Sequence, residues 1–244
     1  MKAVVRLAVL LLLAALALQL YFLARVALMA VVDPVSTTFQ RSEIWRLATT
    51  QGRVDWAQQW APHEAISDHL RRAVIASEDA GFIEHGGVEW DAIQAAAQKN
   101  ERAQARADKV NAKNPKRQAV PKVVGGSTIS QQLAKNLFLS GERTALRKGQ
   151  ELVITLMLEA CLSKGRILDI YLNNVEWGEG VFGAQAAARH YFRVDAARLS
   201  PAAAARLAVM LPAPKRFEKN PGSAYVSGRA STIAARMGDV DLPP

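Results

Sequence analysis

Two adjacent acidic residues, Glu78 and Asp79, follow the short apolar run AVIAS, residues 73–77. Leu70, Val74 and Glu78 are spaced four residues apart, so in a helix they share one face, and Glu78 continues an apolar stripe. Glu78 also lies near the predicted C-terminal end of this helix, where the macrodipole disfavours negative charge. A carboxylate in this position either turns outward to solvent or serves as a general base whose pKa is raised by apolar surroundings.

A glycine pair leads into a predicted helix start in the segment GGSTISQQLAKN, residues 125–136. Thr128 and Gln131 have the spacing of a capping box, which stabilises a helix without any further function. A glycine-rich loop that enters a helix N-terminus also presents free N–H groups to an anion. Lys135 lies one to two turns further along and adds a positive charge. The segment therefore predicts either a simple cap or an anion-binding loop.

A third segment, ERTALRKGQELVITLMLEACL, carries its charged residues at one end of a very apolar helix. Arg147 and Glu151 are spaced i, i+4, and a surface ion pair is sufficient to explain them, although the base-before-acid orientation is the weaker one. Glu151 and Glu159 lie among Leu, Val, Ile and Met, so we expect at least one of them to face a cleft. The cationic residues of the segment are Arg143, Arg147 and Lys148.

The N-terminal region is apolar from Leu7 to Ala24 except for Gln19, and as a helix it would span about 27 Å, close to the thickness of a bilayer core. Lys2 and Arg6 precede it, which places the N-terminus in the cytoplasm. A cleaved signal peptide is the alternative, because residues 15–17 resemble a cleavage site. The apolar run continues past that site, so we favour an uncleaved anchor that is not part of the folded core.

Charge and metal-binding residues limit the possible partners. The net charge is +9, and residues 98–124 hold eight basic and two acidic residues, a local net charge of +6. Such a segment is either merely solvated or binds an anionic partner, and for a domain outside the cytoplasm anionic lipid head groups or a pyrophosphate fit the charge better than nucleic acid. Cys161 is the single cysteine, so neither an intramolecular disulfide nor a cysteine-based zinc cluster is expected, and the four histidines lack metal-ligand spacing.

The periodicity predicts a mainly α fold with helices at 66–80, 88–110, 129–139, 144–163, 164–173, 181–191 and 200–211. Residues 35–60 have no clear pattern, and their tryptophans (Trp45, Trp56 and Trp60) suit either a membrane interface or a core. We therefore divide the chain into an N-terminus with its transmembrane anchor (1–33), a membrane-proximal connector (34–61) and a main domain (62–244).

In this order, the segments together resemble the peptidoglycan glycosyltransferase family, the domain found in bifunctional penicillin-binding proteins. The similarity runs from about residue 34 to residue 238, and the basic insertion before Gly125 is longer than the usual connection. No Ser-x-x-Lys nucleophile motif is present, so the branch that the chain resembles is the monofunctional biosynthetic peptidoglycan transglycosylases. The matching motifs are Glu78-Asp79-x-x-Phe82-x-x-His85-x-Gly87, Gly125 to Asn136, Arg147-Lys148-x-x-Glu151, KGRILDIYLN (164–173) and LAVMLPAPKRFEKNP (207–221).

This resemblance implies a lysozyme-like glycosyltransferase domain behind a single N-terminal transmembrane helix. It implies a periplasmic enzyme of the bacterial inner membrane that polymerises lipid II into a β-1,4-linked nascent glycan strand and releases undecaprenyl pyrophosphate. Glu78 would be the base, and Glu151 would orient the cations, help to hold a divalent cation (Mg²⁺ or Mn²⁺) with Glu78 and the pyrophosphate, or both. Besides these catalytic candidates, the substrate-binding candidates are Asp79, Phe82, His85, Gly126, Ser127, Thr128, Gln131, Gln132, Lys135, Asn136, Arg143, Arg147 and Lys148.

Two other functions are open at this point. A lysozyme-like enzyme that cleaves glycan strands also uses a lone Glu, but it needs no cationic clamp for pyrophosphate. A catalytically inactive scaffold of the divisome would be marked by the loss of Glu78 or Glu151, and both are present. Membrane lipids are expected partners, whereas the sequence does not identify cell-division or wall-synthesis proteins that would bind.

Overall fold

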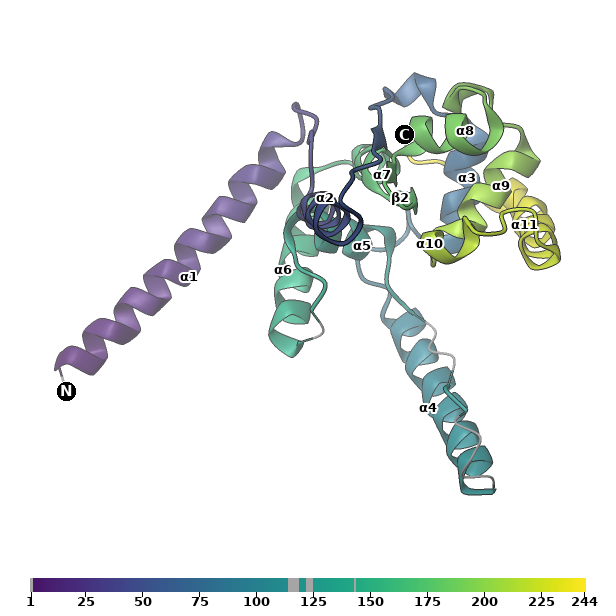
Figure 1. The fold of residues 1–244 in the computed structure, drawn as a ribbon. Helices are drawn as coiled ribbons and strands as arrows, with labels where there is room; N and C mark the ends of the chain where they lie inside the picture. Colours follow the sequence, from purple (N-terminus) through teal and green to yellow (C-terminus); the bar gives the residue numbers. More distant parts are fainter. Residues whose placement is uncertain (1, 114–118, 122–124, 143) are drawn as a thin grey trace.

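The computed structural model describes residues 2–113, 119–121, 125–142 and 144–244 and has a mainly α fold, as predicted (Figure 1). The predicted helices agree with the observed ones to within a few residues, except that residues 181–182 are a strand. The helices are α1 (Lys2–Leu28), α2 (Thr38–Gln51), α3 (Asp68–Glu78), α4 (Trp90–Lys113), α5 (Ile129–Phe138), α6 (Ala145–Cys161), α7 (Lys164–Asn174), α8 (Ala184–Phe192), α9 (Pro201–Met210), α10 (Pro214–Phe217) and α11 (Ala224–Arg236). The strands are β1 (Ala57–Gln58), β2 (Glu176–Gly178) and β3 (Val181–Phe182).

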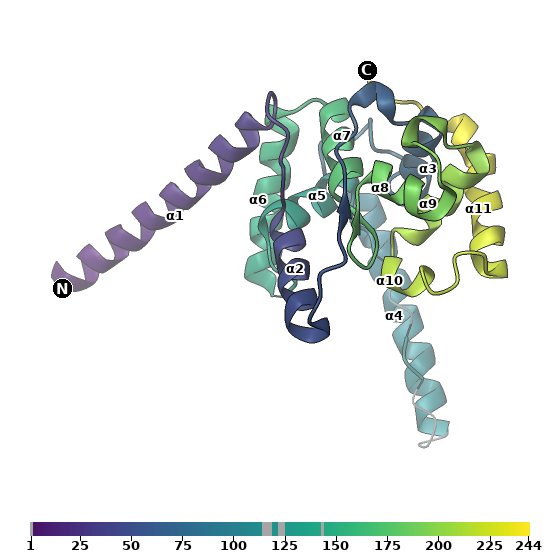
Figure 2. The ribbon, with the colours of Figure 1, turned by 45° about the horizontal axis from the view of Figure 1, so that its top comes forward.

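Two groups of helices build the body around one apolar core (Figures 1 and 2). Helices α3, α9 and α11 pack against one another on one side, and α5 packs against α2, α6 and α7 on the other. Helix α7 also contacts α8, so it links the two groups. The C-terminus of α3 and the N-terminus of α5 meet where the groups join, since Asp79 accepts a hydrogen bond from the amide of Ile129 at 2.9 Å.

Helix α2 and strand β1 lie in residues 35–60, the segment that has no clear sequence pattern. Thr37 and Gln40 form a capping box at the start of α2, and the Gln40 side chain donates to Asn174 Oδ1 at 3.3 Å. Strand β3 pairs in parallel with β1 and antiparallel with β2. Trp56 stacks on Phe182 with ring centroids 4.5 Å apart. Most of the segment thus contacts the main domain, although Trp45 is exposed.

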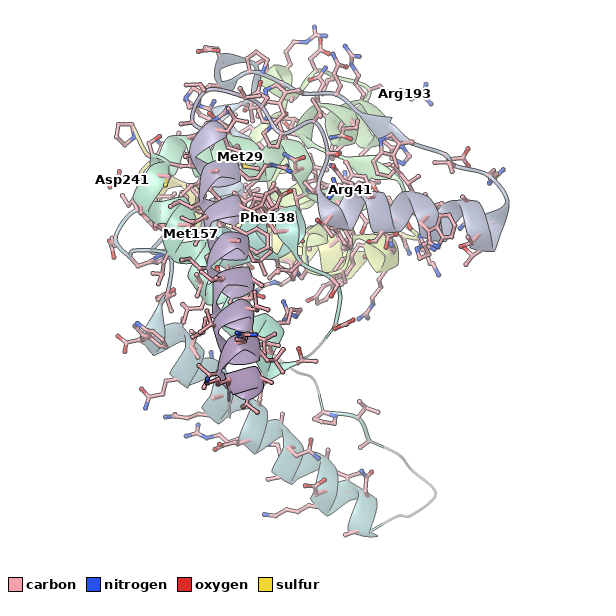
Figure 3. All side chains as sticks on the ribbon, turned by 90° about the vertical axis from the view of Figure 1, so that its left-hand side faces the viewer. Met29, Arg41, Phe138, Met157, Arg193 and Asp241 are labelled. Carbon is pink, nitrogen blue, oxygen red and sulfur yellow. The ribbon has the colours of Figure 1, made fainter. Side chains whose placement is uncertain are left out.

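Helix α1 extends from the body over most of its length and docks on it only near its C-terminus (Figures 1 and 3). Within the described residues it is the one helix long and apolar enough to cross a membrane. Phe22, Val26 and Met29 are buried in the core, and the rings of Phe22 and Phe138 meet edge to face at 5.3 Å. The expectation that the anchor is not part of the folded core is therefore wrong for the segment from Phe22 to Met29. Because α1 is apolar on every side, its sequence has no periodicity that could indicate which face packs against the body.

One polar contact also joins the anchor to α6. Gln19, the one polar residue of the apolar run, exchanges two side-chain hydrogen bonds with Gln150, at 2.8 and 3.0 Å. An amide in an apolar environment is costly without such partners. The pair therefore fixes which face of α1 meets α6, and it does so close to the charged end of that helix.

Deleting residues 1–32 is expected to destabilise the domain, because it removes Phe22, Val26 and Met29 from the core. Fully burying such a side chain contributes about 1.5–3 kcal/mol. We expect thermal unfolding in detergent to shift down by at least about 5 °C. Deleting only residues 2–18 removes the undocked part and should change the unfolding temperature by less than about 2 °C. Equal melting temperatures for the native chain and the longer deletion would contradict the docking of α1.

Candidate active site

Glu78 is the last residue of α3, one turn beyond the buried Val74. Its carboxylate accepts hydrogen bonds from Gln132 Nε2 at 3.0 Å and from Ser77 Oγ at 3.4 Å. Burial raises the pKa of Glu78 above its ordinary value, and the negative charge of Asp79 adds to this, while the two hydrogen bonds oppose it. The structure therefore gives Glu78 the environment that the sequence pattern predicted for a general base.

The amide of Gln132 is held in one orientation by a buried tyrosine. Tyr171, from α7, donates its hydroxyl hydrogen bond to Gln132 Oε1 at 2.9 Å. The Gln132 oxygen is thereby occupied, so the NH₂ group is the one that faces Glu78. Burial raises the pKa of Tyr171 well above its ordinary value, and the carboxylates of Glu78 and Asp79 contribute, so its phenol remains a donor. Three helices, α3, α5 and α7, thus position one carboxylate.

Asp79 is buried and joins two segments instead of facing solvent. One carboxylate oxygen accepts from the amide of Ile129 at the start of α5, and the other accepts from His85 Nε2 at 2.8 Å. The amide of Gly87 donates to His85 Nδ1 at 3.0 Å, so the neutral ring carries its proton on Nε2. An anion at a helix N-terminus is favoured by the macrodipole. Asp79 and His85 therefore hold the loop after α3 against α5.

Thr128 caps α5 and ties the cap to the same loop. Its hydroxyl accepts from the amide of Gln131, and the Gln131 side chain accepts from the Thr128 amide, which confirms the predicted capping box. The Thr128 hydroxyl also donates to Gly87 O at 2.6 Å. Gly87 has φ +88, and a Cβ there would lie 2.7 Å from Glu159 Cγ, so only glycine fits.

A cavity of about 200 Å³ lies beside Glu78. The loop Gly125–Thr128 forms one side of it, so the exposed Ser127 and the preceding Gly126 border the cavity. A Cβ on Gly126 would lie 2.9 Å from Ala92 O, so the glycine lets the loop lie directly against α4. The remaining lining residues are Asp79 and, on or just before α4, Glu89, Ala92, Ala95, Ala96 and Lys99.

The second group of predicted residues gathers around Glu151, on α6. Glu151 is 3% exposed, and its carboxylate pairs with Arg147 at 2.7 Å and with Lys148. This is a buried carboxylate between two cations, so the interpretation as a surface ion pair is incorrect. Arg143 lies outside the described residues.

Lys135 connects this cluster to α5. It is exposed, yet the surrounding protein removes part of its solvation, and this desolvation lowers the pKa of its ammonium group. The charge of Glu151 opposes the shift, whereas Arg147 and Lys148 reinforce it. These electrostatic contacts place Lys135 beside the cation cluster.

The remaining predicted residues have packing roles in the structure. Phe82 is buried, with its ring edge to face with His85 at 6.4 Å and the Lys164 ammonium 4.6 Å from its centroid. Asn136 is buried within α5. Neither side chain lines the cavity beside Glu78.

A polar network that was not predicted from the sequence lies beneath the loop after α3. Ser130 donates to Glu159 Oε1 at 2.5 Å, and Lys164 bridges Glu159 at 2.9 Å and His85 O at 2.7 Å. The only signals were the position of Glu159 among apolar residues and of Lys164 at the head of the segment KGRILDIYLN. The Lys164 hydrogen bond to His85 O connects the network to the loop that leads out of α3, so the network stabilises this loop.

Three described side chains near Glu78 could together act as metal ligands. Asp79, His85 and Glu89 place ligand atoms within 4.8 Å of one another. However, both Asp79 oxygens and both His85 nitrogens already have hydrogen-bond partners, and both Glu151 oxygens pair with cations. A metal ion at either place would displace these contacts, so neither the cluster of Asp79, His85 and Glu89 nor Glu151 fits a preformed metal site.

The sequence of this chain matches a known protein family and several known proteins. The family model described as Transglycosylase matches residues 46–238, which contain Glu78, the capped loop and the cation cluster. A biosynthetic peptidoglycan transglycosylase of Burkholderia thailandensis is 53% identical over 228 residues, covering 93% of this chain and 83% of that protein. One from Paraburkholderia xenovorans is 48% identical over 229 residues, covering 93% and 88%. The chain belongs to the transglycosylase family and is a peptidoglycan glycosyltransferase with a lysozyme-like domain.

Proposed function

We propose that this enzyme polymerises lipid II, with Glu78 as the general base and the cluster of Lys135, Arg147 and Lys148 as the clamp for the leaving pyrophosphate. One observation carries the proposal: helix α5 contacts both groups. Gln132 donates to Glu78, and Lys135, three residues later, interacts electrostatically with Glu151. Helix α5 therefore contributes Lys135 and packs between the helix that carries the base, α3, and the helix that carries Arg147 and Lys148, α6, so it sets the separation of the base and the cations.

In the proposed reaction, the acceptor sugar 4-hydroxyl attacks the anomeric carbon of the donor. The new C–O bond forms as the bond to the pyrophosphate oxygen breaks, and the hydroxyl proton passes to Glu78. Negative charge grows on the departing undecaprenyl pyrophosphate, where the cations stabilise it. Direct displacement inverts the α-linked donor and yields a β-1,4 bond. Glu151 neither donates nor accepts a proton in this scheme; it holds Arg147 and Lys148 in place.

We propose that α1 crosses the inner membrane once, with the N-terminus in the cytoplasm and the catalytic domain in the periplasm. The basic residues before the apolar run, Lys2 and Arg6, support this orientation. Both substrates are lipids, so an anchored site works at a raised effective concentration. We further propose that the chain has no transpeptidase activity, because it contains no Ser-x-x-Lys nucleophile motif.

A glycan-cleaving enzyme is the competing function, and the cation cluster disfavours it, because hydrolysis releases no pyrophosphate. The discriminating experiment gives the purified full chain either labelled lipid II or isolated glycan strands. We expect a ladder of polymer from lipid II on a gel and no shortening of the strands. Shortened strands without any polymer would establish the competing function, and activity on neither substrate would indicate a scaffold.

The pH dependence of the reaction should report the raised pKa of Glu78. A general base must be deprotonated, so the acidic limb of kcat/KM is expected above the ordinary Glu pKa of about 4.3. The hydrogen bond from Gln132 lowers this pKa, so Gln132→Leu should move the limb to still higher pH. Rates measured across pH for both proteins test this. A limb that stays in place would show that Gln132 does not act through Glu78.

A further inference from the structure

We propose that α4 carries a docking surface for anionic phospholipid head groups, which we call the basic stripe: Lys99, Arg102, Arg106 and Lys109. Their spacing of three, four and three residues places all four on one face of a helix. The inference goes beyond the proposed chemistry and depends only on the proposed membrane location.

All four side chains of the basic stripe are exposed, and no ion pair joins them to another described residue. The two acidic residues of the helix beyond its first turn, Glu101 and Asp108, lie on a different face, and Asp108 accepts a hydrogen bond from Gln104 at 2.8 Å. The positive charges are therefore not neutralised within the described part of the domain. A row of unpaired cations fits a row of anions.

Another face of α4 is already covered by the chain itself. Ala96 and Ala107 are buried, and Asn111 exchanges two hydrogen bonds with the backbone of Ala119, at 3.2 and 2.7 Å. The basic stripe lies on neither the covered face nor the acidic face. It is the part of this protruding helix that is open to a partner.

The orientation of α4 favours a membrane as that partner. In Figures 1 and 3, α4 and the free N-terminal part of α1 both run downward from the body, although they diverge in Figures 1 and 2, with α1 to the left and α4 downward. Helix α1 is the candidate membrane-spanning helix, so the shared downward direction brings α4 toward the side of the bilayer. Its charges are spread along about 15 Å of helix, which exceeds one pyrophosphate and suits several head groups.

The test uses the full chain in vesicles and measures contact between α4 and lipid. Ala105, exposed beside the basic stripe, is replaced by Cys in a Cys161→Ser background and labelled with a fluorophore. Vesicles of phosphatidylcholine, with or without phosphatidylglycerol, carry a head-group quencher. We expect quenching only with phosphatidylglycerol, and we expect high salt to reverse it, because the Debye length falls from about 10 Å at 0.1 M to about 3 Å at 1 M.

The variant with Arg102→Gln, Arg106→Gln and Lys109→Gln should reduce the ratio of docked to free α4 on the order of 100-fold. Lys99 is left unchanged because it also lines the cavity beside Glu78. The matched control replaces three exposed arginines away from α4, Arg193, Arg229 and Arg236, by Gln and should dock like the native chain. Replacing Glu101 and Asp108 by Gln and Asn should strengthen docking.

Three outcomes would overturn the proposal. Equal quenching in both kinds of vesicle, or equal quenching of the native chain and the triple α4 variant, would show that the basic stripe does not bind anionic lipid. Release of α4 by inorganic pyrophosphate at constant ionic strength would assign the stripe to the substrate instead. Because the readout is lipid contact, it can fail while polymerisation of lipid II is unaffected.

Discussion

Replacing Glu78 by Gln is expected to lower the rate of glycan polymerisation about 10²–10⁴-fold, the usual cost of losing a general base. The amide has the same shape but cannot take the proton of the acceptor hydroxyl. Initial rates with labelled lipid II measure the effect. Near-native turnover by the folded variant would show that another group removes the proton.

The same variant should fold at least as well as the native chain at neutral pH. A carboxyl whose pKa is raised in the folded state binds more protons there than in the unfolded chain, so its contribution to stability falls as pH rises through that window. Gln carries no charge at any pH, so the Glu78→Gln variant does not lose this stability as pH rises. Glu84→Gln is the matched control, because Glu84 is an exposed acid only six residues away and should leave both rate and melting temperature unchanged.

Replacing Glu151 by Gln is expected to lower kcat about 10²–10³-fold, the cost of losing one preorganised electrostatic group. Without the buried carboxylate, Arg147 and Lys148 lose their shared counter-charge and repel each other. Because the clamp acts on charge that develops in the transition state, kcat should fall more than KM rises. Steady-state kinetics with lipid II separate the two constants.

A milder variant and a control define the role of Glu151. Glu151→Asp keeps the charge but shortens the side chain, so it should be intermediate. Glu142→Gln removes an exposed charge just before the N-terminus of α6 and should leave kcat and KM unchanged. We expect Glu151→Gln to cost less stability than the about 3–5 kcal/mol of a fully buried pair, because Lys148 is half exposed. A change in KM alone would contradict a role in the transition state.

Local patterns in the sequence predicted the parts of the site that depend on neighbouring residues. The stripe through Leu70, Val74 and Glu78 gave a buried carboxylate as one of two alternatives, and the spacing of Thr128 and Gln131 predicted the capping box. Both depend on residues within two helical turns of each other, where helical geometry alone sets the contact.

Several contacts that were not predicted from the sequence join distant segments. Tyr171 fixes the amide of Gln132 across 39 residues, and it looks like an ordinary core residue in its apolar segment. Gln19 meets Gln150 across 131 residues. Such pairs depend on how helices pack, which no local periodicity encodes.

Helix α2 was missed for a related reason. Its start carries a capping box at Thr37 and Gln40, and its end has Gly52 in the left-handed conformation, so local signals were present. The segment between them has no clear apolar stripe, since its buried residues include Gln40 and Glu43 as well as Leu47. Burial of these polar residues depends on partners in other elements, such as Asn174 and Lys215.

The most direct test of the proposed reaction counts its products. The purified full chain is given lipid II labelled in both the sugar and the lipid, and the glycan formed and the undecaprenyl pyrophosphate released are measured together, followed by digestion of the glycan with a β-1,4-specific muramidase. We predict one pyrophosphate lipid released for each disaccharide added, and complete digestion of the polymer. Polymer that forms without a matching release of the pyrophosphate lipid, or a polymer that resists the muramidase, would contradict the account.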